Sequence, residues 1–403
     1  MRRLFQLEKV EFKKELNERI LPFWVKLLDY ENGGSYGIVD YDLTLHKDSP
    51  KGGVVGARHL WSYSGAYLLT KDEKYLRAAE HSYHFLINAL WDQEHKGIYW
   101  LVDHLGQPLI STKHIYAQSF AIYGLSEYVK ASDNKEALTY AIDLFHLLED
   151  TCFSTTYGGY KEEFTQDWIQ TEHHLLNEGA NAVFTTNSHL HLLEAYTNLY
   201  SVWPDRQLLS KINYLLDLFY SKIYHPTEHV CRVAFDENWQ STKEAYSYGH
   251  DIETSWLLTE TLHITGLDRP DIVEMNKQIA YKVAVEGIDP DGSIYDAKKE
   301  GNIHKTRIWW AQAEAVIGFY NAYQLTKDEQ FIQLSERAWT YIQKKIHDPR
   351  TGGEWFSRID EHGEVISSLR NDQYQTPENI ADSWKGFYHN GRMCYELIKR
   401  LPE

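Results

Sequence analysis

Apolar residues recur with a helical period along most of the chain, and the periodic segments come in pairs joined by short polar turns. A helical hairpin that returns at a regular interval is typical of repeat proteins, in which neighbouring hairpins bury each other's apolar faces. The predicted pairs are 58–70 with 71–91, 117–134 with 135–151, 188–205 with 206–224, 251–268 with 269–287, and 309–329 with 330–346.

The two ends of the chain supply one further pair. Residues 391–400 have the pattern of an inner helix, and residues 11–28 that of its outer partner, so we expect the ring to close. We therefore predict an all-α fold, an (α/α)6 barrel of six helical hairpins formed by residues 1–403 as one domain. Segments rich in glycine and aromatic residues, such as 91–108 and 348–363, predict short β-hairpin loops at one mouth of the barrel.

Charge and composition narrow the classes of partner. The formal net charge of -17 repels nucleic acids and anionic membrane surfaces, so we expect neither as a partner. The first twenty residues lack the apolar core of a secretion signal, and no apolar run is long enough to span a membrane. The three cysteines show no disulfide or metal spacing. We expect a cytoplasmic protein that is a monomer or a weak homo-oligomer.

Polar residues stand near the start of each predicted inner helix, about one repeat apart, although the segments they enter are apolar. If the ring closes, they would converge on its central cavity. These residues are Arg58, Gln118, His191, His250, Gln312 and Asn390.

Each of these motifs also has a structural interpretation. His250 and Glu253 are three positions apart and share a helix face, so the carboxylate could orient the imidazole. They could equally cap the helix together with Asp251. Arg58 could stabilise developing negative charge or form a helix-start salt bridge. Trp309 and Trp310 fit a hydrophobic core as well as a binding surface.

Motifs for common cofactors are absent from the sequence. There is no H-E-x-x-H pattern, no Cys/His ligand spacing, no phosphate-binding loop and no dinucleotide fingerprint. We therefore expect no metal and no cofactor.

Four long motifs identify a resemblance that covers essentially the whole chain. "NSHLHLLEAYTNLY", "YSYGHDIETSWLL", "RIWWAQAEAVIGFYNAYQ" and "WKGFYHNGRMCYELIKR" resemble the cellobiose 2-epimerases of the N-acylglucosamine 2-epimerase superfamily. The resemblance implies an (α/α)6 barrel and an isomerase that needs no cofactor. It also implies epimerisation at C2 of the reducing-end glucose or mannose unit of a β-1,4-linked disaccharide.

The resemblance further implies which residues act. His191, His250 and His389 would be the acid/base residues, and the sugar site would be lined by Arg58, Tyr116, Asn187, Glu253, Trp309 or Trp310, Glu314 and Trp384. Our hypothesis is that His250 and His389 exchange the C2 proton through an enediolate while His191 assists ring opening. Glu253 would orient His250, and Arg58 with Asn187 would stabilise charge on O1.

One departure from the family pattern affects the expected substrate. Where the cellobiose epimerases have Cys-Pro before the Tyr-His pair, this chain has Gly386 and Phe387. We expect this change to reshape the pocket beside His389. A mannose 2-epimerase or mannose isomerase that acts on free monosaccharide therefore remains an alternative. A more distant alternative is an (α/α)6 glycoside hydrolase, which would recruit two carboxylates.

Overall fold

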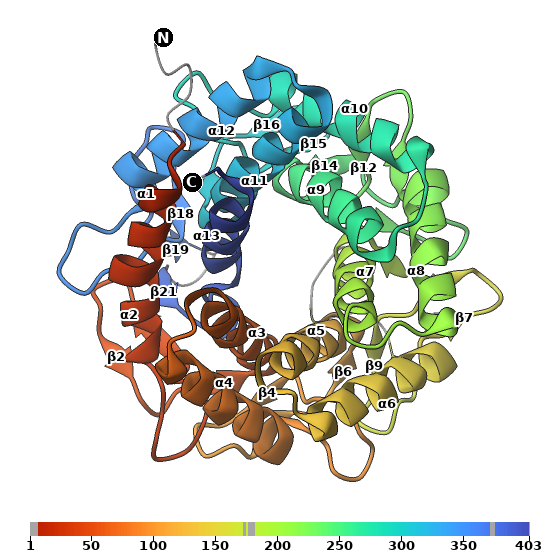
Figure 1. The fold of residues 1–403 in the computed structure, drawn as a ribbon, viewed down its shortest axis with the longest axis vertical. Helices are drawn as coiled ribbons and strands as arrows, with labels where there is room; N and C mark the ends of the chain where they lie inside the picture. Colours follow the sequence, from red (N-terminus) through yellow and green to blue (C-terminus); the bar gives the residue numbers. More distant parts are fainter. Residues whose placement is uncertain (1–6, 172–174, 176–181, 371–374, 403) are drawn as a thin grey trace.

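Six helices form a closed inner ring. The computed structural model describes residues 7–171, 175, 182–370 and 375–402. Each inner helix packs against the next one along the chain, and the last packs against the first, so the ring is complete (Figure 1). The inner helices are α3 (Gly53–Thr70), α5 (Ile115–Ser132), α7 (Thr186–Tyr200), α9 (Tyr248–Thr265), α11 (Trp309–Thr326) and α13 (Tyr388–Arg400).

An outer layer of helices surrounds this ring (Figure 1). Its members are α1 (Lys9–Lys14), α2 (Leu21–Val25), α4 (Glu73–Phe85), α6 (Lys135–Thr151), α8 (Arg206–Leu218), α10 (Pro270–Glu286) and α12 (Glu329–Tyr341). π-Helical turns extend or join these helices at Glu15–Ile20, Leu86–Leu90, Phe219–Ile223 and Ile342–Ile346. Because α1 packs against α13, the predicted pairing of the two chain ends and the (α/α)6 barrel are confirmed. In the described part of the chain, no helix combines the length and apolar character needed to cross a bilayer.

Short antiparallel strands connect the hairpins, as predicted. The three-stranded sheets are β2–β1–β21, β3–β4–β5 and β14–β15–β16, and the two-stranded ones are β6–β9, β7–β8, β10–β13, β11–β12, β17–β18 and β19–β20. The strands are β1 (Ile38–Asp40), β2 (Leu45–His46), β3 (Lys51–Gly52), β4 (Leu101–Val102), β5 (Pro108–Ile110), β6 (Lys113–His114), β7 (Phe153–Ser154), β8 (Gly159–Tyr160), β9 (Glu163–Phe164), β10 (Phe184–Thr185), β11 (Tyr224–His225), β12 (Val230–Cys231), β13 (Ala234–Phe235), β14 (Ala245–Ser247), β15 (Ala297–Lys299), β16 (Asn302–His304), β17 (Arg307–Ile308), β18 (Arg358–Ile359), β19 (Ser368–Arg370), β20 (Gln375–Pro377) and β21 (Asn379–Ala381).

Buried ion pairs fix several of these connections. Lys51, just before α3, bonds Asp29 at 2.7 Å, and Lys113, just before α5, bonds Asp92 at 3.0 Å. Both acids also accept backbone N–H groups from the turns that they begin. Each pair therefore ties the end of one outer helix to the start of the next inner helix, since a buried charge must be paired.

Three of the polar residues near the inner-helix starts do not face the cavity, so that part of the prediction is wrong. Gln118 is fully buried and bonds both the backbone N–H and the carbonyl of Ile98, at 2.7 and 2.8 Å. Gln312 does the same with Ile294, at 2.9 and 2.8 Å. Asn390 donates to Glu354. These side chains satisfy buried loop backbone or a buried acid, which would otherwise cost free energy.

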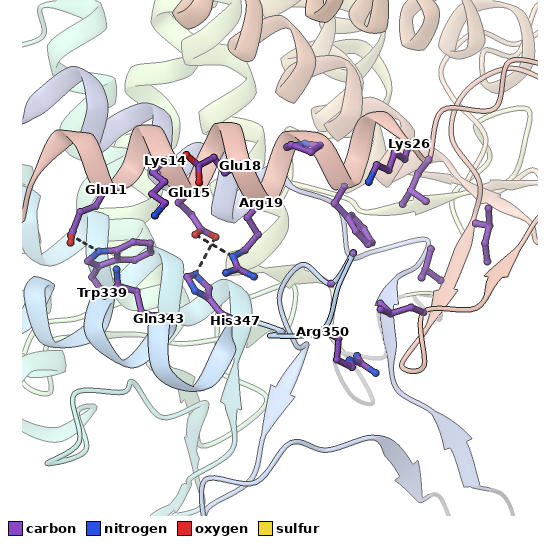
Figure 2. A pocket seen from close by; sticks show the side chains of 18 residues that line it. Glu11, Lys14, Glu15, Glu18, Arg19, Lys26, Trp339, Gln343, His347 and Arg350 are labelled. Carbon is purple, nitrogen blue, oxygen red and sulfur yellow. Dashed lines mark hydrogen bonds and ion pairs between the residues drawn. The ribbon is translucent and has the colours of Figure 1, made fainter.

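A seam between the two ends of the chain closes the barrel (Figure 2). Glu15 accepts a hydrogen bond from Trp355 Nε1 at 2.7 Å and lies 3.1 Å from His347 Nε2, while Glu11 accepts from Trp339 Nε1 at 2.9 Å. A cavity of about 720 Å³ lies along this seam, and none of the predicted site residues lines it.

Candidate active site

Apart from Trp384, which precedes α13, the predicted site residues lie in the first two turns of the inner helices. The inner helices begin two to five residues earlier than predicted, except α11, which begins at Trp309 as predicted. Residues such as Thr185 and Ser247 cap these earlier starts: Thr185 Oγ1 accepts from Ser188 N and Ser247 Oγ from His250 N. His191 is the sixth residue of α7, His250 the third of α9 and His389 the second of α13.

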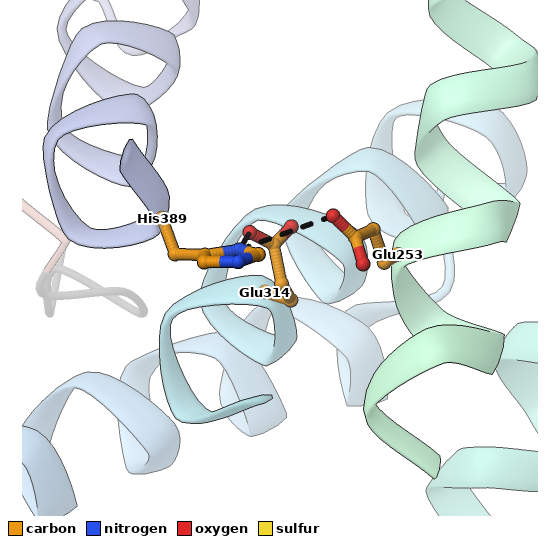
Figure 3. A group of neighbouring side chains, drawn as sticks. All are labelled: Glu253, Glu314 and His389. Carbon is orange, nitrogen blue, oxygen red and sulfur yellow. Dashed lines mark hydrogen bonds and ion pairs between the residues drawn. The ribbon is translucent and has the colours of Figure 1, made fainter. Parts of the chain in front are cut away.

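Two of the three histidines are held by buried carboxylates. His191 Nδ1 lies 2.9 Å from Glu194 Oε2, one turn along α7. His389 Nδ1 lies 2.7 Å from Glu314 Oε1, which reaches it from α11 (Figure 3). A carboxylate on Nδ1 fixes the tautomer in which Nδ1 carries the proton, so each Nε2 is left as the basic nitrogen. Both rings are therefore oriented for proton transfer at Nε2.

Arg392 joins these two pairs beneath the cavity. Its Nη1 donates to Glu194, and its Nη2 donates to Glu253 and, at 2.7 Å, to Glu314. Tyr388 completes the group by donating to Glu194 at 2.6 Å. One fully buried guanidinium thus positions the carboxylates behind both His191 and His389.

The charges in this network set the protonation of the site. Burial opposes ionisation of Glu194, but Arg392 and the His191 hydrogen bond outweigh it and lower its pKa to about 2. Burial and the neighbouring Glu314 raise the pKa of Glu253, against the opposing charge of Arg392. Burial, followed by the positive charges of Arg58 and Arg392, holds the pKa of His389 well below its usual value.

His250 has different surroundings from those predicted. Its ring packs on Trp310, with 4.7 Å between the ring centroids. The Trp310 ring in turn lies 5.4 Å, centroid to centroid, from the ring of His389. The expectation that Glu253 orients His250 is wrong, because one oxygen of Glu253 bonds Arg392 and the other has no partner. Burial, and then the charge of a protonated His191, lowers the pKa of His250 to about 3.

The indole of Trp310 fits beside α9 because residue 249 is a glycine. A Cβ at Gly249 would lie 2.6 Å from Trp310 Cη2 and 2.8 Å from Ala311 Cβ. Such distances are not tolerated, so any larger residue would displace the ring that lies between His250 and His389.

A cavity of about 900 Å³ opens beside these residues. Asn187, His250 and Trp310 line it together with the ribbon formed by β14 and β15. Pockets for small organic ligands measure roughly 300–1,000 Å³, so this one has room for more than one sugar ring.

Arg58, Tyr116 and Trp384 lie together at the site, as expected from the sequence. Arg58 is buried and donates to the Tyr116 hydroxyl at 2.7 Å and to the Trp384 carbonyl at 3.0 Å. Its guanidinium also lies over the rings of Phe120 and Tyr388, at 4.2 and 4.9 Å from their centroids. Arg58 therefore positions the two aromatic residues to which it donates.

Two predicted sugar contacts lie elsewhere. Glu314 is fully buried, and its two oxygens are engaged by Trp256, His389 and Arg392, so it lies behind the histidine and away from the cavity surface. Of the tryptophan pair, Trp310 lines the cavity, whereas the ring of Trp309 faces the Lys385 ammonium at 5.6 Å.

The departure at Gly386 and Phe387 does not reshape the pocket in the expected way. Phe387 is fully buried against Trp24, His59 and Tyr63, with centroid distances of 5.5, 5.5 and 4.9 Å. A Cβ at Gly386 would meet Val55 at 3.0 Å and His59 at 3.1 Å. Both residues pack toward the first hairpin and away from the cavity that Trp310 lines.

Glu253, Glu314 and His389 lie close enough together to suggest a metal-binding group (Figure 3). Arg392 Nη2, however, donates to one oxygen atom of Glu253 and to one of Glu314. A guanidinium therefore already supplies the positive charge that two adjacent carboxyl groups require.

Sequence reasoning missed the role of Glu194 and left Arg392 without one. His191 and Glu194 have the same three-residue spacing that singled out His250 and Glu253, so that rule would have found the pair. Arg392 had no comparable signal, since its three partners come from three other helices and lie at least 78 residues away in sequence.

Comparison with known proteins agrees with the fold. The family model for N-acylglucosamine 2-epimerase (GlcNAc 2-epimerase) matches residues 34–375. The chain is 40% identical to a cellobiose 2-epimerase of Dictyoglomus turgidum, with 98% of each chain covered, and 40% identical to one of Bacteroides fragilis, with 98% and 99% covered.

Solved structures extend the likeness to three dimensions. The cellobiose 2-epimerase of Bacillus thermoamylovorans superposes with a TM-score of 0.94 at 45% identity, covering 98% of this chain and 99% of that one. A D-mannose isomerase superposes with a TM-score of 0.86 at 20% identity, with 98% of each chain covered, which is a likeness of fold alone. The chain thus belongs to the N-acylglucosamine 2-epimerase family.

Proposed function

We propose that this protein epimerises C2 of the reducing-end glucose or mannose unit of a β-1,4-linked disaccharide such as cellobiose, without a cofactor. The observation that carries the proposal is the placement of His250 and His389 against the same indole, Trp310. Supporting it, the chain is 40% identical over nearly its full length to curated cellobiose 2-epimerases.

The reaction begins with opening of the sugar ring. The C2 proton becomes acidic only when C1 is an aldehyde, so a proton must first move between the ring oxygen and O1. His191 suits this step because Glu194 fixes its tautomer and stabilises the imidazolium that forms when Nε2 takes a proton.

The C2 proton is then exchanged between two imidazoles. His389 Nε2 removes the proton as a general base, and Glu314 stabilises the resulting imidazolium through Nδ1. The enediolate receives a proton on its other face from His250, which must enter this step as the imidazolium and is left neutral. The low pKa of His389 keeps its ring neutral before the reaction, as a general base requires. After each turnover His389 releases its proton to solvent and His250 takes one up, and in the reverse reaction the two residues exchange roles.

Negative charge grows on O1 in the enediolate. Arg58 donates to the oxygen of Tyr116, which leaves the hydroxyl hydrogen of Tyr116 free to point at the sugar. We assign the donor at O1 to Tyr116 and Asn187, and the role of positioning Tyr116 to Arg58. A preorganised donor of this kind contributes roughly 3–4 kcal/mol to the transition state.

The glycoside hydrolase alternative receives no support from the site. Hydrolysis needs two carboxyl groups that reach a scissile bond. Asp251, Glu253 and Glu314, the acids considered for this role, are all fully buried beneath the cavity. The same chemistry acting on free mannose remains the alternative. Identification of the products formed from cellobiose and from mannose distinguishes the two substrates.

The proposal is tested by following C2 of the sugar in D2O by NMR. Wild-type protein with cellobiose should place deuterium at C2 and give 4-O-glucosyl-mannose, and a chelator should have no effect. His389→Ala should reduce this exchange by about 10²–10⁴-fold because the base is lost. His263→Ala, an exposed histidine near the other end of α9, is the matched control and should retain full activity. Retained exchange in His389→Ala, or fructose as the main product from mannose, would contradict the proposal.

A further inference from the structure

A buried carboxylate, Glu354, gathers side chains from separate parts of the fold behind the first turn of α13. Its Oε1 accepts from Trp24 Nε1 at 3.3 Å and from Asn390 Nδ2, and its Oε2 accepts from Trp355 N at 2.8 Å. The ammonium of Lys385 lies 3.5 Å from Oε2. Glu354 is fully buried and lines neither of the two cavities described above, so these contacts hold the fold and do not reach a ligand directly.

Lys385 holds the loop that leads into α13. Its buried ammonium donates to the carbonyl oxygens of Trp355 and Ile380, at 2.5 and 2.6 Å. A buried cation must be paired, and Glu354 supplies the opposite charge. The loop is therefore attached to the inside of the protein four residues before His389.

Asn390 connects the same carboxylate to the helix itself. Among the described residues, no side chain caps the start of α13, so its first N–H groups receive little support from the helix. Asn390 is the third residue of α13 and directly follows His389. Because Asn390 is fully buried and donates to Glu354, it fixes the turn of the helix that carries the imidazole.

We propose that Glu354 is a positioning residue, which acts through Asn390 to place the imidazole of His389 for proton transfer at C2. This inference rests on the proposed function, because it takes His389 as the base. Glu314 fixes the ring through Nδ1, whereas Glu354 fixes the backbone on which the ring is carried. Lys385 supports the arrangement from the preceding loop. A displacement of about 1 Å at a reacting group can reduce the rate about 100-fold, so this second support is needed for catalysis.

Two variants weaken the arrangement from its two sides. Asn390→Ala removes the bond between the helix and Glu354, and Lys385→Met removes the charge that pairs with it. In both, kcat for cellobiose should fall about 10–100-fold while KM changes less than about twofold, because the base is displaced and the sugar contacts remain. Urea unfolding gives the folded fraction by which each rate is corrected.

Each variant has a matched control elsewhere in the barrel. Asn276→Ala removes a buried asparagine of α10 that donates to Thr259 at 3.1 Å. Lys51→Met removes a buried lysine before α3 that pairs with Asp29 at 2.7 Å. Both controls should lose stability to a similar extent but retain most of kcat, since neither group is connected to α13.

Proton NMR provides a measurement that a loss of stability alone does not change. The Nδ1–H proton between His389 and Glu314 should resonate at low field, and its loss in His389→Ala assigns it. In Asn390→Ala and in Lys385→Met this resonance should shift, because the ring moves relative to its carboxylate. The corresponding resonance of His191 should stay where it is.

Unchanged kcat in both variants, an equal loss of kcat in the controls, or a loss confined to KM overturns the proposal. If wild-type protein exchanges no C2 proton, the proposed function fails. A shifted His389 resonance in the two variants would then still support positioning by Glu354, and an unshifted resonance would overturn it.

Discussion

At the scale of single residues, the proposed base depends on groups that never touch the sugar. His389 is held by Glu314, which is fully buried, and Glu314 is held in turn by Arg392 and Trp256. The neutral imidazole is favoured by burial, and the imidazolium formed in the reaction is favoured by the carboxylate. Proton transfer at His389 therefore requires both the burial of its ring and the carboxylate behind it.

Replacement of Glu314 by Gln should separate positioning from binding. The amide preserves the shape of the side chain but removes the charge that stabilises protonated His389, so kcat should fall about 100-fold while KM for cellobiose changes little. The pKa of His389 should fall further, which moves the acidic limb of the pH profile of kcat/KM to lower pH. Steady-state kinetics over a range of pH provide the measurement. Glu329→Gln, at an exposed position on α12, is the control. A loss confined to KM would show that Glu314 contacts the substrate.

At the scale of elements, one position recurs as a clamp between an inner helix and the preceding loop. The fourth residue of α5 is Gln118 and that of α11 is Gln312, and both bond a loop N–H and a loop carbonyl. In α9 the same position holds Asp251, whose Oδ1 accepts from Cys231 N at 2.8 Å while Oδ2 has no partner. Asp251 is thus a loop clamp, and the helix cap is Ser247. An acid is less suited to this position than an amide.

Asp251→Asn should therefore stabilise the protein at alkaline pH. Burial raises the pKa of Asp251 to about 8 against the opposing Cys231 hydrogen bond, so the folded state retains a proton that the unfolded state releases near pH 4. Wild-type stability should fall as the pH rises between these values, because the folded state binds more protons. At pH 8 the variant should gain roughly 1–3 kcal/mol in the free energy of unfolding.

Urea unfolding at pH 5 and at pH 8 measures this effect. The gain should be smaller at pH 5, because ionisation of the carboxyl favours the unfolded state less at that pH. Asp268→Asn, at an exposed acid, should show no such difference between the two pH values. A destabilised Asp251→Asn protein at pH 8 would mean that the ionised carboxylate is required by the loop.

At the scale of the whole molecule, closure of the ring depends on contacts between the ends of the chain. Glu15, at the start of the π-helical turn that follows α1, bonds Trp355, which is more than 330 residues away. It also pairs with the equally distant His347 and lies 3.4 Å from Arg19 (Figure 2). These contacts tie the π-helical turn Glu15–Ile20 to the segment that follows the last outer helix.

Glu15→Ala should lower the free energy of unfolding by about 2–3 kcal/mol, because it leaves the buried Trp355 N–H without an acceptor. Burial opposes the ionisation of Glu15, but the hydrogen bonds from His347 and Trp355 lower its pKa, so its contribution should be present above about pH 4.5 and be lost as the pH falls. Chemical denaturation at pH 7 and pH 4 tests both statements. Glu18→Ala, at an exposed position on the same turn, should have little effect, and equal losses in the two variants would contradict the role of the seam.

The sequence alone determined the helical hairpins, their number and the pairing of the chain ends, because the apolar period that buries each helix is a local property of the chain. It also located the histidines and Arg58, since polar residues stand out in apolar helices. Local spacing could not show which polar residues face the axis. Gln118 and Gln312 had the same signal as His191, yet they bond loop backbone.

Only the tertiary structure decided the partners of each side chain. Glu253 and Glu314 were placed beside the sugar from sequence, but both turn inward because Arg392 from a third helix supplies the positive charge that two buried carboxyl groups need. The same closure sends Phe387 into the first hairpin. Helix periodicity determines which residues share a face of a helix, whereas packing between distant helices determines which side chains that face contacts.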